Sequence, residues 1–183
     1  MDKIGVLFVQ GGGEGAHDAD ALLAASLERD LGGGYQVRYP RMPDEAAPEA
    51  GSWTRRISGE ISRLGEEAIL VGHSLGGAML LKYLSRAKAK QRIAGLFLIA
   101  APAWDGKSWD FDLLKLPDGI EDKLASIPRL FLYHSRDDAV VPFEHLALHK
   151  ANIPKATVRA VNGRGHQFGN DLSVVARDIL GRE

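Results

Sequence analysis

Gly72-His73-Ser74-Leu75-Gly76-Gly77 joins a short apolar run at residues 68–71 to a segment of helical periodicity at 75–87. The stretch satisfies the pattern G-x-S-x-G, which forms a sharp turn when it lies between a strand and a helix. Glycines two residues before and two after the serine let strand and helix approach closely, and the turn strains the serine backbone. The sequence therefore predicts that the Ser74 hydroxyl points into the space above the strand ends, with the Leu75 N–H at a helix start.

Apolar runs of strand length alternate with longer helical segments along the rest of the chain. Strands are expected at residues 4–9, 35–39, 68–71, 96–100, 129–133 and 157–161, and helices at 17–31, 50–64, 75–87, 143–150 and 171–180. The expected buried face of the first helix consists of Ala21, Leu22, Ala25 and Leu27. Apolar strands separated by helices are typical of a parallel sheet covered on both faces. We therefore expect a three-layer α/β/α sandwich with about six mainly parallel strands, built as one domain over residues 1–183.

Composition narrows the class of protein. The chain has 183 residues and no cysteine, which excludes disulfides, thiolate metal sites and a cysteine nucleophile. Its 23 Lys and Arg balance 24 Asp and Glu, so no basic surface is expected to bind nucleic acid or an anionic membrane. No apolar run approaches the roughly 20 residues of a membrane span, and the amino terminus has no signal-peptide pattern. These features predict a soluble, cytoplasmic protein with no nucleic-acid or membrane partner; they do not indicate an oligomeric state.

Two later loops carry the residues that a reactive serine requires. A serine hydroxyl is a weak nucleophile that needs a base, and the base needs an acid to orient it. Residues 134–142 follow the fifth expected strand and contain Asp138, whereas residues 162–168 follow the sixth and contain His166. Both loops are expected at carboxyl ends of strands, where open α/β sheets bind their ligands. The chain order of serine, acid and histidine agrees with a triad built on the Ser74 turn.

With these residues the chain resembles a compact α/β-hydrolase over essentially its whole length. In that family the acid is an Asp four residues before a Pro, as Asp138 stands before Pro142. Asp137 does not fit that register and remains the alternative acid. His166 matches the base, and it is the one histidine of six that lies on a loop after the final expected strand. The resemblance thus implies Ser74, Asp138 and His166 as the catalytic residues.

The resemblance also implies where an oxyanion would be bound. One donor is the Leu75 backbone N–H, and the second belongs to the loop after the first strand. Family members often have His-Gly there, whereas this chain has Gln10-Gly11-Gly12. The implied second donor is the Gly12 N–H, with Gln10 in the place of the histidine.

A small lid and two aromatic side chains are the candidates for the substrate pocket. Residues 103–127 interrupt the alternation of strands and helices and are long for a plain connection, so we expect a small lid or insert there. Trp104 is the candidate wall of an acyl pocket, and His17, beside the first glycine loop, is a second candidate contact. With so short a lid, the resemblance implies a small acyl group.

Other histidines have simpler interpretations. The resemblance implies that His73, which precedes Ser74, packs beneath the serine turn. His145 and His149 are expected on a surface helix at i, i+4, a spacing that would need a third ligand to hold a metal. No metal or organic cofactor is expected.

These inferences predict a serine hydrolase of carboxylesterase or thioesterase type, which cleaves a small carboxylic ester or thioester through an acyl-enzyme. One alternative comes from Gly11-Gly12-Gly13-Glu14-Gly15-Ala16, which satisfies G-x-G-x-x-[GA] and favours a Rossmann-like nucleotide-binding protein or reductase, with Arg41 as a phosphate contact. That interpretation leaves the serine turn and both later loops unexplained. A second alternative is a binding protein with the α/β-hydrolase fold and no catalysis.

Overall fold

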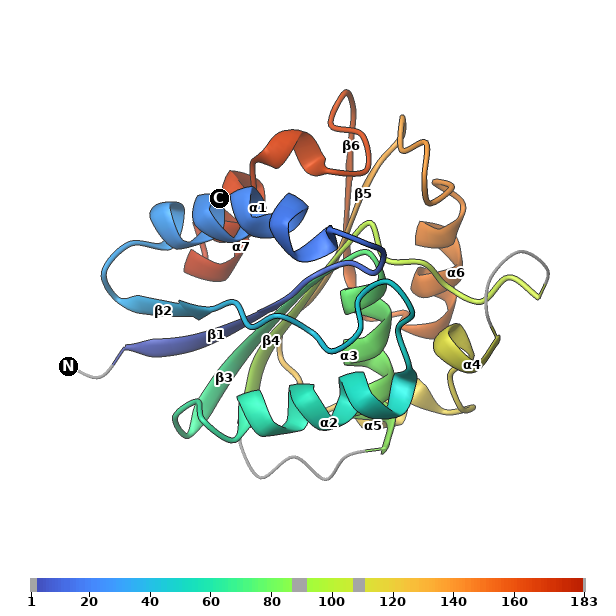
Figure 1. The fold of residues 1–183 in the computed structure, drawn as a ribbon, viewed down its shortest axis with the longest axis horizontal. Coiled ribbons are helices and arrows are strands. Elements are labelled where there is room, and N and C mark those ends of the chain that lie inside the picture. The colour runs from blue at the N-terminus through green and yellow to red at the C-terminus, as the bar shows by residue number, and fades with distance from the viewer. Residues whose placement is uncertain (1–2, 87–91, 107–110, 183) are drawn as a thin grey trace.

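A computed structural model describes residues 3–86, 92–106 and 111–182 (Figure 1). Its strands are β1 (Ile4–Val9), β2 (Tyr35–Arg38), β3 (Glu67–His73), β4 (Arg92–Ile99), β5 (Leu130–Ser135) and β6 (Thr157–Val161). Its α-helices are α1 (Ala16–Leu31), α2 (Ala50–Ile61), α3 (Leu75–Arg86), α4 (Phe111–Leu114), α5 (Ile120–Leu124), α6 (His145–Asn152) and α7 (Ser173–Leu180), and a short 3₁₀ turn covers Phe168–Asn170. None of the helices within these ranges is long and apolar enough to cross a membrane.

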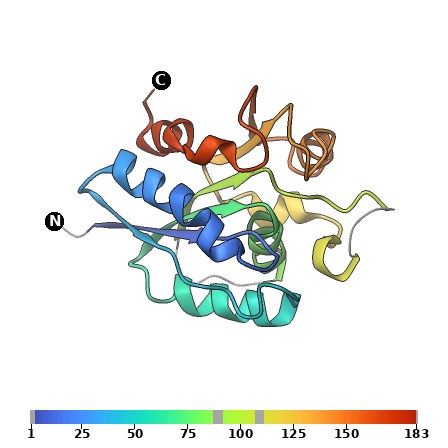
Figure 2. The ribbon, with the colours of Figure 1, turned by 45° about the horizontal axis from the view of Figure 1, so that its top comes forward.

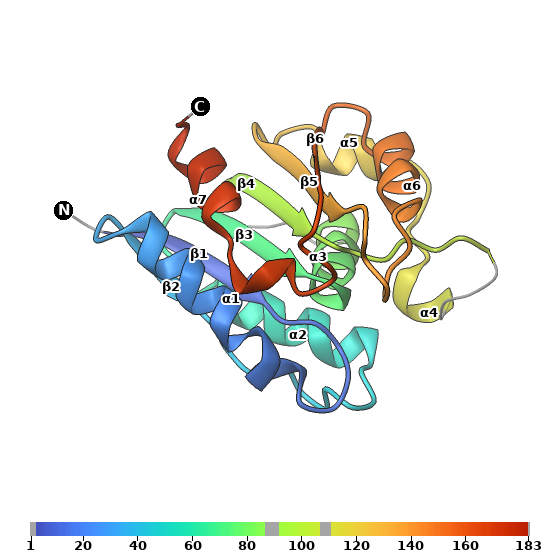
Figure 3. The ribbon, with the colours of Figure 1, turned by 90° about the horizontal axis from the view of Figure 1, so that it is seen from above.

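The six strands form one sheet in the order β2-β1-β3-β4-β5-β6, and every neighbouring pair is parallel. Figure 3 shows the strands running in a common direction. The chain leaves β1 toward β2 on one side and continues through β3 on the other. The loops after β1 and β3 therefore leave the sheet at a topological switch point, where ligands of open α/β sheets bind. Both the glycine loop and the serine turn lie there.

Helices cover both faces of the sheet, as the nearly all-apolar strands predict. Helices α1 and α7 pack on one face, and α2 and α3 pack on the other (Figures 1 and 2). Alternate residues of each strand enter the two cores: in β1, Val6 and Phe8 face α1 and α7, while Leu7 and Val9 face α2 and α3. The expected α/β/α sandwich is confirmed.

The expected buried face of α1 was wrong. The helix buries Asp20, Leu23, Ala24, Ser26, Leu27 and Leu31. Of the four residues expected to be buried, only Leu27 is, and Leu22 is 59% exposed. Both sets recur at helical spacing, so periodicity alone did not separate them. The rotation of α1 on the sheet determines which of the two sets is buried, and it places the Asp20 carboxylate on the inner face.

Helices α6 and α7 begin later than expected because of local hydrogen bonds. Helix α6 begins at His145 and not at Phe143, because a turn in which the Pro142 carbonyl accepts from the His145 N–H comes first. Helix α7 begins at Ser173, whose N–H donates to the Asp171 carboxylate at 2.9 Å in the turn that precedes the helix. The region expected as a lid contains the two short helices α4 and α5.

Candidate active site

The serine turn has the strained geometry that its sequence predicts. Ser74 lies between β3 and α3 with φ of 50°, in the left-handed region that side chains rarely adopt. Its N–H donates to the Ile99 carbonyl at 2.8 Å, which ties the turn to the end of β4. A Cβ on Gly76 would lie 2.3 Å from the carbonyl oxygens of both Val9 and Gln10. Only glycine at that position allows α3 to start so close to β1.

The histidine and the acid meet from the loops after β6 and β5. His166 Nδ1 lies 2.9 Å from Asp138 Oδ2, and the Asp138 side chain is fully buried. The other carboxylate oxygen accepts the N–H groups of Val140 and Val141 at 2.8 and 2.9 Å, and His134 Nε2 lies 3.2 Å from Oδ2. Burial alone would raise the pKa of Asp138, but these hydrogen bonds outweigh it and hold the pKa well below its ordinary value. Asp138 is therefore a carboxylate that orients the His166 ring.

The alternative acid, Asp137, occupies a different place. Its carboxylate accepts a hydrogen bond from the Ser135 hydroxyl, and the Gly165 N–H lies 3.4 Å from the same oxygen. The Ser135 hydrogen bond lowers the pKa of Asp137. Asp137 thus contacts the backbone of the histidine loop, whereas the ring of His166 is held by Asp138.

Ser74 and His166 line one hollow of about 190 Å³ at the switch point. The remaining residues of its wall are Gly11, Gly12, Glu14, Gly15, Ala16, Ala19, Asp20, His73 and Gln167. Among the described residues no hydrogen bond joins the Ser74 hydroxyl to His166, and in free enzymes such bonds are often long and tighten with substrate. The arrangement brings a hydroxyl, an imidazole and a carboxylate from three strand ends to one place.

The glycine loop approaches the start of α3 closely. A Cβ on Gly12 would lie 2.5 Å from the Leu75 side chain, so a larger residue would push the two segments apart. Within the described part of the chain, neither the Gly12 N–H nor the Leu75 N–H donates a hydrogen bond. Both donors border the serine and are available to an oxygen atom bound there.

Hydrogen bonds of Gln10 and Glu45 fix the position of the glycine loop. The buried Gln10 side chain donates to the Glu45 carboxylate at 2.6 Å and accepts the Met42 N–H at 3.0 Å. The Glu45 carboxylate in turn accepts hydrogen bonds from the N–H groups of Gly15 and His17 at 3.2 and 2.9 Å. Glu45 thereby caps the start of α1. The Gln10 amide and the His17 N–H lower the pKa of Glu45. Gln10, where family members have histidine, is therefore a structural support of the loop.

The Glu45 carboxylate at the start of α1 argues against the nucleotide-binding alternative. A dinucleotide site places its pyrophosphate on the N–H groups at the start of the first helix. Here Glu45 occupies those groups, and Arg41 is paired with Glu45 and Asp18 at 2.9 and 2.8 Å. The Glu45 carboxylate would repel a phosphate at this position. The glycines therefore fit the close approach of the loop to the Ser74 turn better than a nucleotide site.

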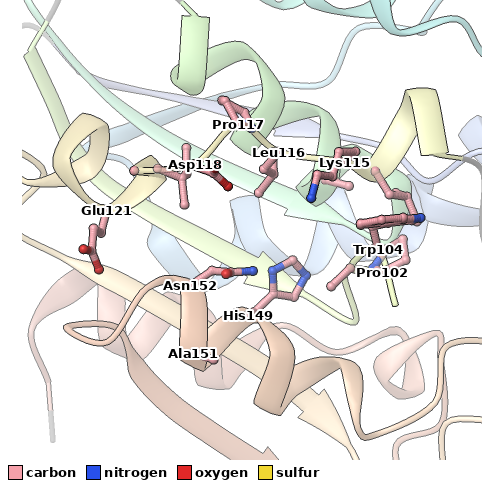
Figure 4. A pocket seen from close by; sticks show the side chains of 15 residues that line it. Pro102, Trp104, Lys115, Leu116, Pro117, Asp118, Glu121, His149, Ala151 and Asn152 are labelled. Atoms are coloured by element: carbon pink, nitrogen blue, oxygen red, sulfur yellow. The ribbon is translucent and has the colours of Figure 1, made fainter. Parts of the chain in front are cut away.

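The two candidate pocket residues lie outside the Ser74 hollow. Trp104 lines a separate cavity of about 270 Å³ between the expected lid and α6, with Lys115 over its ring at 4.4 Å (Figure 4). His17 stacks on Tyr39, with ring centroids 4.4 Å apart. Trp109, an aromatic residue of the same expected lid (residues 103–127), lies outside the described residues.

The expected surface helix for His145 and His149 was wrong, because both side chains are 3% exposed. His145 Nδ1 accepts the Ala103 N–H at 2.9 Å, and His149 Nε2 donates to the Ala101 carbonyl at 3.1 Å. Burial lowers the pKa of His149 to about 4. The pair thus attaches α6 to the segment that follows β4, and the described residues contain no group of three that could hold a metal.

Sequence reasoning missed two side chains that contact the site residues. Asp20 is buried and lies 2.8 Å from His73 Nδ1, so His73 has polar partners and is more than a packing residue. The signal was present: Asp20 precedes Leu23 and Leu27 by three and seven residues and so lies on their helix face. The second is His134, whose Nε2 lies 3.2 Å from Asp138 Oδ2 and which precedes Asp138 by four residues.

Comparison with known proteins agrees with this geometry. A family model described as serine hydrolase matches residues 24–170. YdeN of Bacillus subtilis, named as a hydrolase, is 27% identical over 119 residues, which cover 63% of this chain and 62% of YdeN. The match therefore spans less than two thirds of that relative's length.

Solved structures show the same fold at low sequence identity. The crystal structure of the YdeN gene product superposes with a TM-score of 0.76 at 23% identity, over 99% of this chain and 97% of that chain. A metagenome-derived lipolytic enzyme of the LipS and LipT pair gives 0.71 at 19% identity, over 98% and 93%. The meta-cleavage product hydrolase CumD of Pseudomonas fluorescens gives 0.70 at 17% identity, over 98% and 90%. With its parallel six-stranded sheet and a family match over most of its length, the chain belongs to the serine hydrolase family and has the α/β-hydrolase fold.

Proposed function

We propose that this hydrolase cleaves a small carboxylic ester or thioester through an acyl-enzyme formed on Ser74. The observation that carries the proposal is the Asp138–His166 hydrogen bond of 2.9 Å at the hollow that Ser74 also lines. A buried carboxylate on one ring nitrogen leaves the other nitrogen to accept a proton from a serine in the same hollow.

In the proposed reaction, Ser74 Oγ attacks the carbonyl carbon while His166 Nε2 takes the hydroxyl proton. The N–H groups of Gly12 and Leu75 donate to the oxyanion that forms. His166 then gives its proton to the leaving alkoxide or thiolate, and the acyl group remains on Ser74. A water molecule, deprotonated by His166, releases the carboxylic acid and restores the serine. The residues named are sufficient for these steps without a cofactor.

A fluorophosphonate probe tests the nucleophile directly, because it phosphonylates only a serine that has a working base. We expect stoichiometric labelling of the native chain and a labelled peptide that contains Ser74. The Ser74→Ala variant should remain unlabelled while its circular dichroism spectrum is unchanged. Absence of labelling in the native chain would instead support a binding protein with the same fold.

Small residues around Ser74 support a small acyl group. Gly11, Gly12, Gly15, Ala16 and Ala19 form much of the wall, and the hollow measures about 190 Å³, below the usual range of drug-sized ligand pockets. The larger Trp104 cavity adjoins α3 at Ala78, one helical turn beyond Ser74. Short acyl groups therefore fit beside the serine without using that cavity.

We expect p-nitrophenyl acetate and butyrate to give the highest kcat/KM in a series that continues to octanoate and dodecanoate. A steady increase toward dodecanoate would contradict the small acyl site. The Trp104→Ala variant tests whether the acyl chain uses the Trp104 cavity as well as the Ser74 hollow. A changed ratio of octanoate to acetate rates would assign Trp104 to the wall of the acyl pocket, and an unchanged ratio would exclude it from that wall. The acetate rate itself should stay within about threefold of native, because an acetyl group beside Ser74 does not reach the separate Trp104 cavity.

A further inference from the structure

Asp20 is a buried carboxylate in the wall of the Ser74 hollow, and both of its oxygens have hydrogen-bond partners. Oδ2 accepts the Gly11 N–H at 2.8 Å and lies 2.8 Å from His73 Nδ1. Oδ1 accepts the side-chain amide of Gln167 at 2.7 Å. Burial favours the neutral acid, but the hydrogen bonds from His73, Gln167 and Gly11 outweigh it and lower the pKa of Asp20. Asp20 is thus an ionised acceptor with three donors.

His73 faces an acceptor at each ring nitrogen. Nδ1 faces the Asp20 carboxylate, and Nε2 lies 2.9 Å from the backbone carbonyl oxygen of His166. A carbonyl oxygen only accepts, so Nε2 must carry a proton, and an ionised carboxylate requires a proton on Nδ1 as well. A neutral imidazole has one N–H and satisfies only one of the two contacts. Beside an ionised Asp20, both contacts are hydrogen bonds only if His73, whose side chain is 2% exposed, is an imidazolium.

We propose that Asp20 and His73 form a buried carboxylate–imidazolium pair that positions the base of the proposed triad against the oxyanion loop. This inference rests on the proposed function of Ser74 and His166. Through Asp20 the pair holds the backbone of Gly11, and through His73 it holds the backbone of His166. Since His73 donates from both nitrogens, it has no lone pair with which to take the serine proton. Asp20 and His73 are positioning residues, and of the two imidazoles that line the hollow, His73 and His166, it is His166 that has a ring nitrogen left for the reaction.

The pair joins parts of the chain that no local structure connects. Gly11 follows β1, Asp20 lies on α1, His73 ends β3 and His166 follows β6. The rings of His73 and His166 are also in contact, with centroids 4.9 Å apart. A shift of about 1 Å in the base relative to the oxyanion donors is enough to lower a rate about 100-fold. Four segments held by one buried ion pair would resist such a shift.

Nuclear magnetic resonance of the native chain tests the charge state without using activity. Long-range ¹H–¹⁵N spectra distinguish an imidazolium, in which both ring nitrogens are protonated, from either neutral tautomer. We expect His73 to give the imidazolium pattern near neutral pH, and assignment follows from loss of the signal in the His73→Gln variant. A neutral pattern near neutral pH would overturn the proposal.

Kinetics of the Asp20→Asn variant test the positioning role. An amide in this place offers an N–H to groups that are themselves donors, so the contacts to Gly11, His73 and Gln167 are not all kept. We expect kcat for p-nitrophenyl acetate to fall about 100-fold with KM changed less than threefold, the result for a displaced base with substrate binding intact. A wild-type kcat in this variant would overturn the proposal.

Glu60→Gln is the matched control, because Glu60 is also a 2% exposed carboxylate, paired with Arg38 at 2.8 Å on the opposite side of the sheet. It should lower thermal stability as Asp20→Asn does but keep the native kcat. A fall of kcat in both variants would assign the effect to stability and overturn the positioning role. If the native chain neither hydrolyses esters nor reacts with a fluorophosphonate, the proposed function fails, while the His73 spectra still decide the ion pair.

Discussion

Replacing His166 by alanine is expected to reduce kcat for p-nitrophenyl acetate by about 10⁵-fold or more, because a nucleophile and its base act as one unit. Without the imidazole, Ser74 keeps its proton when it attacks, and the leaving group receives none. The Gly12 and Leu75 N–H groups remain, so a small rate above that of water should persist. Steady-state kinetics on the folded variant measure both values.

A double variant tests whether Ser74 and His166 act as one unit. The double variant Ser74→Ala/His166→Ala should be no slower than either single variant, since each removes the same pathway. His17→Ala is the matched control, because the His17 ring stacks on Tyr39 and does not line the Ser74 hollow. Its kcat should remain within about threefold of native, and a changed KM would assign His17 to substrate binding. Additive losses in the double variant would contradict a Ser74–His166 unit.

The Asp138→Asn variant is expected to lose about 10⁴-fold in kcat with little change in fold, the loss that follows when the base is held in the wrong tautomer. The N–H groups of Val140 and Val141 select the orientation of the new amide, since they require its oxygen. The amide nitrogen then faces Nδ1 of His166 and offers it a hydrogen. His166 must accept there and carry its own proton on Nε2, which leaves no lone pair for the serine proton.

Asp137→Asn gives the comparison on the adjacent residue. Asp137 contacts Ser135 and Gly165, and its amide analogue keeps one acceptor oxygen for them. We expect kcat to fall by less than about tenfold, which is about 1.4 kcal/mol of activation free energy, because Asp137 acts on His166 through the loop backbone. If Asp137→Asn proved the more damaging substitution, Asp138 would not be the orienting acid.

Much of the fold could be predicted because its signals are local. Strands β1 and β6 begin and end where the apolar runs predict, and each expected helix has a counterpart within a few residues. The serine turn was predictable for the same reason: its glycines are required by contacts within the β3–α3 connection and with the adjacent strand end. The loops that hold Asp138 and His166 could be placed because parallel strands end at one edge.

The failures have one cause. The inner face of α1 was wrong because two sets of residues share the helical period, and the sheet selects between them. His145 and His149 were expected at the surface because nothing near them in sequence reveals the segment after β4 that covers them. Periodicity describes one element, whereas burial depends on which second element packs against it.

By itself, the sequence determined the α/β/α architecture, the serine turn and the chain order of Ser74, Asp138 and His166. These depend on hydrophobic periodicity, on glycine sterics and on chain order, which neighbouring residues encode. Only the tertiary structure decided that Asp138 rather than Asp137 holds His166, that Glu45 caps α1, and that Asp20 pairs with His73. Each of these contacts joins residues from 28 to 53 positions apart. Their geometry follows from the strand order and the rotation of α1 on the sheet, which no single segment specifies.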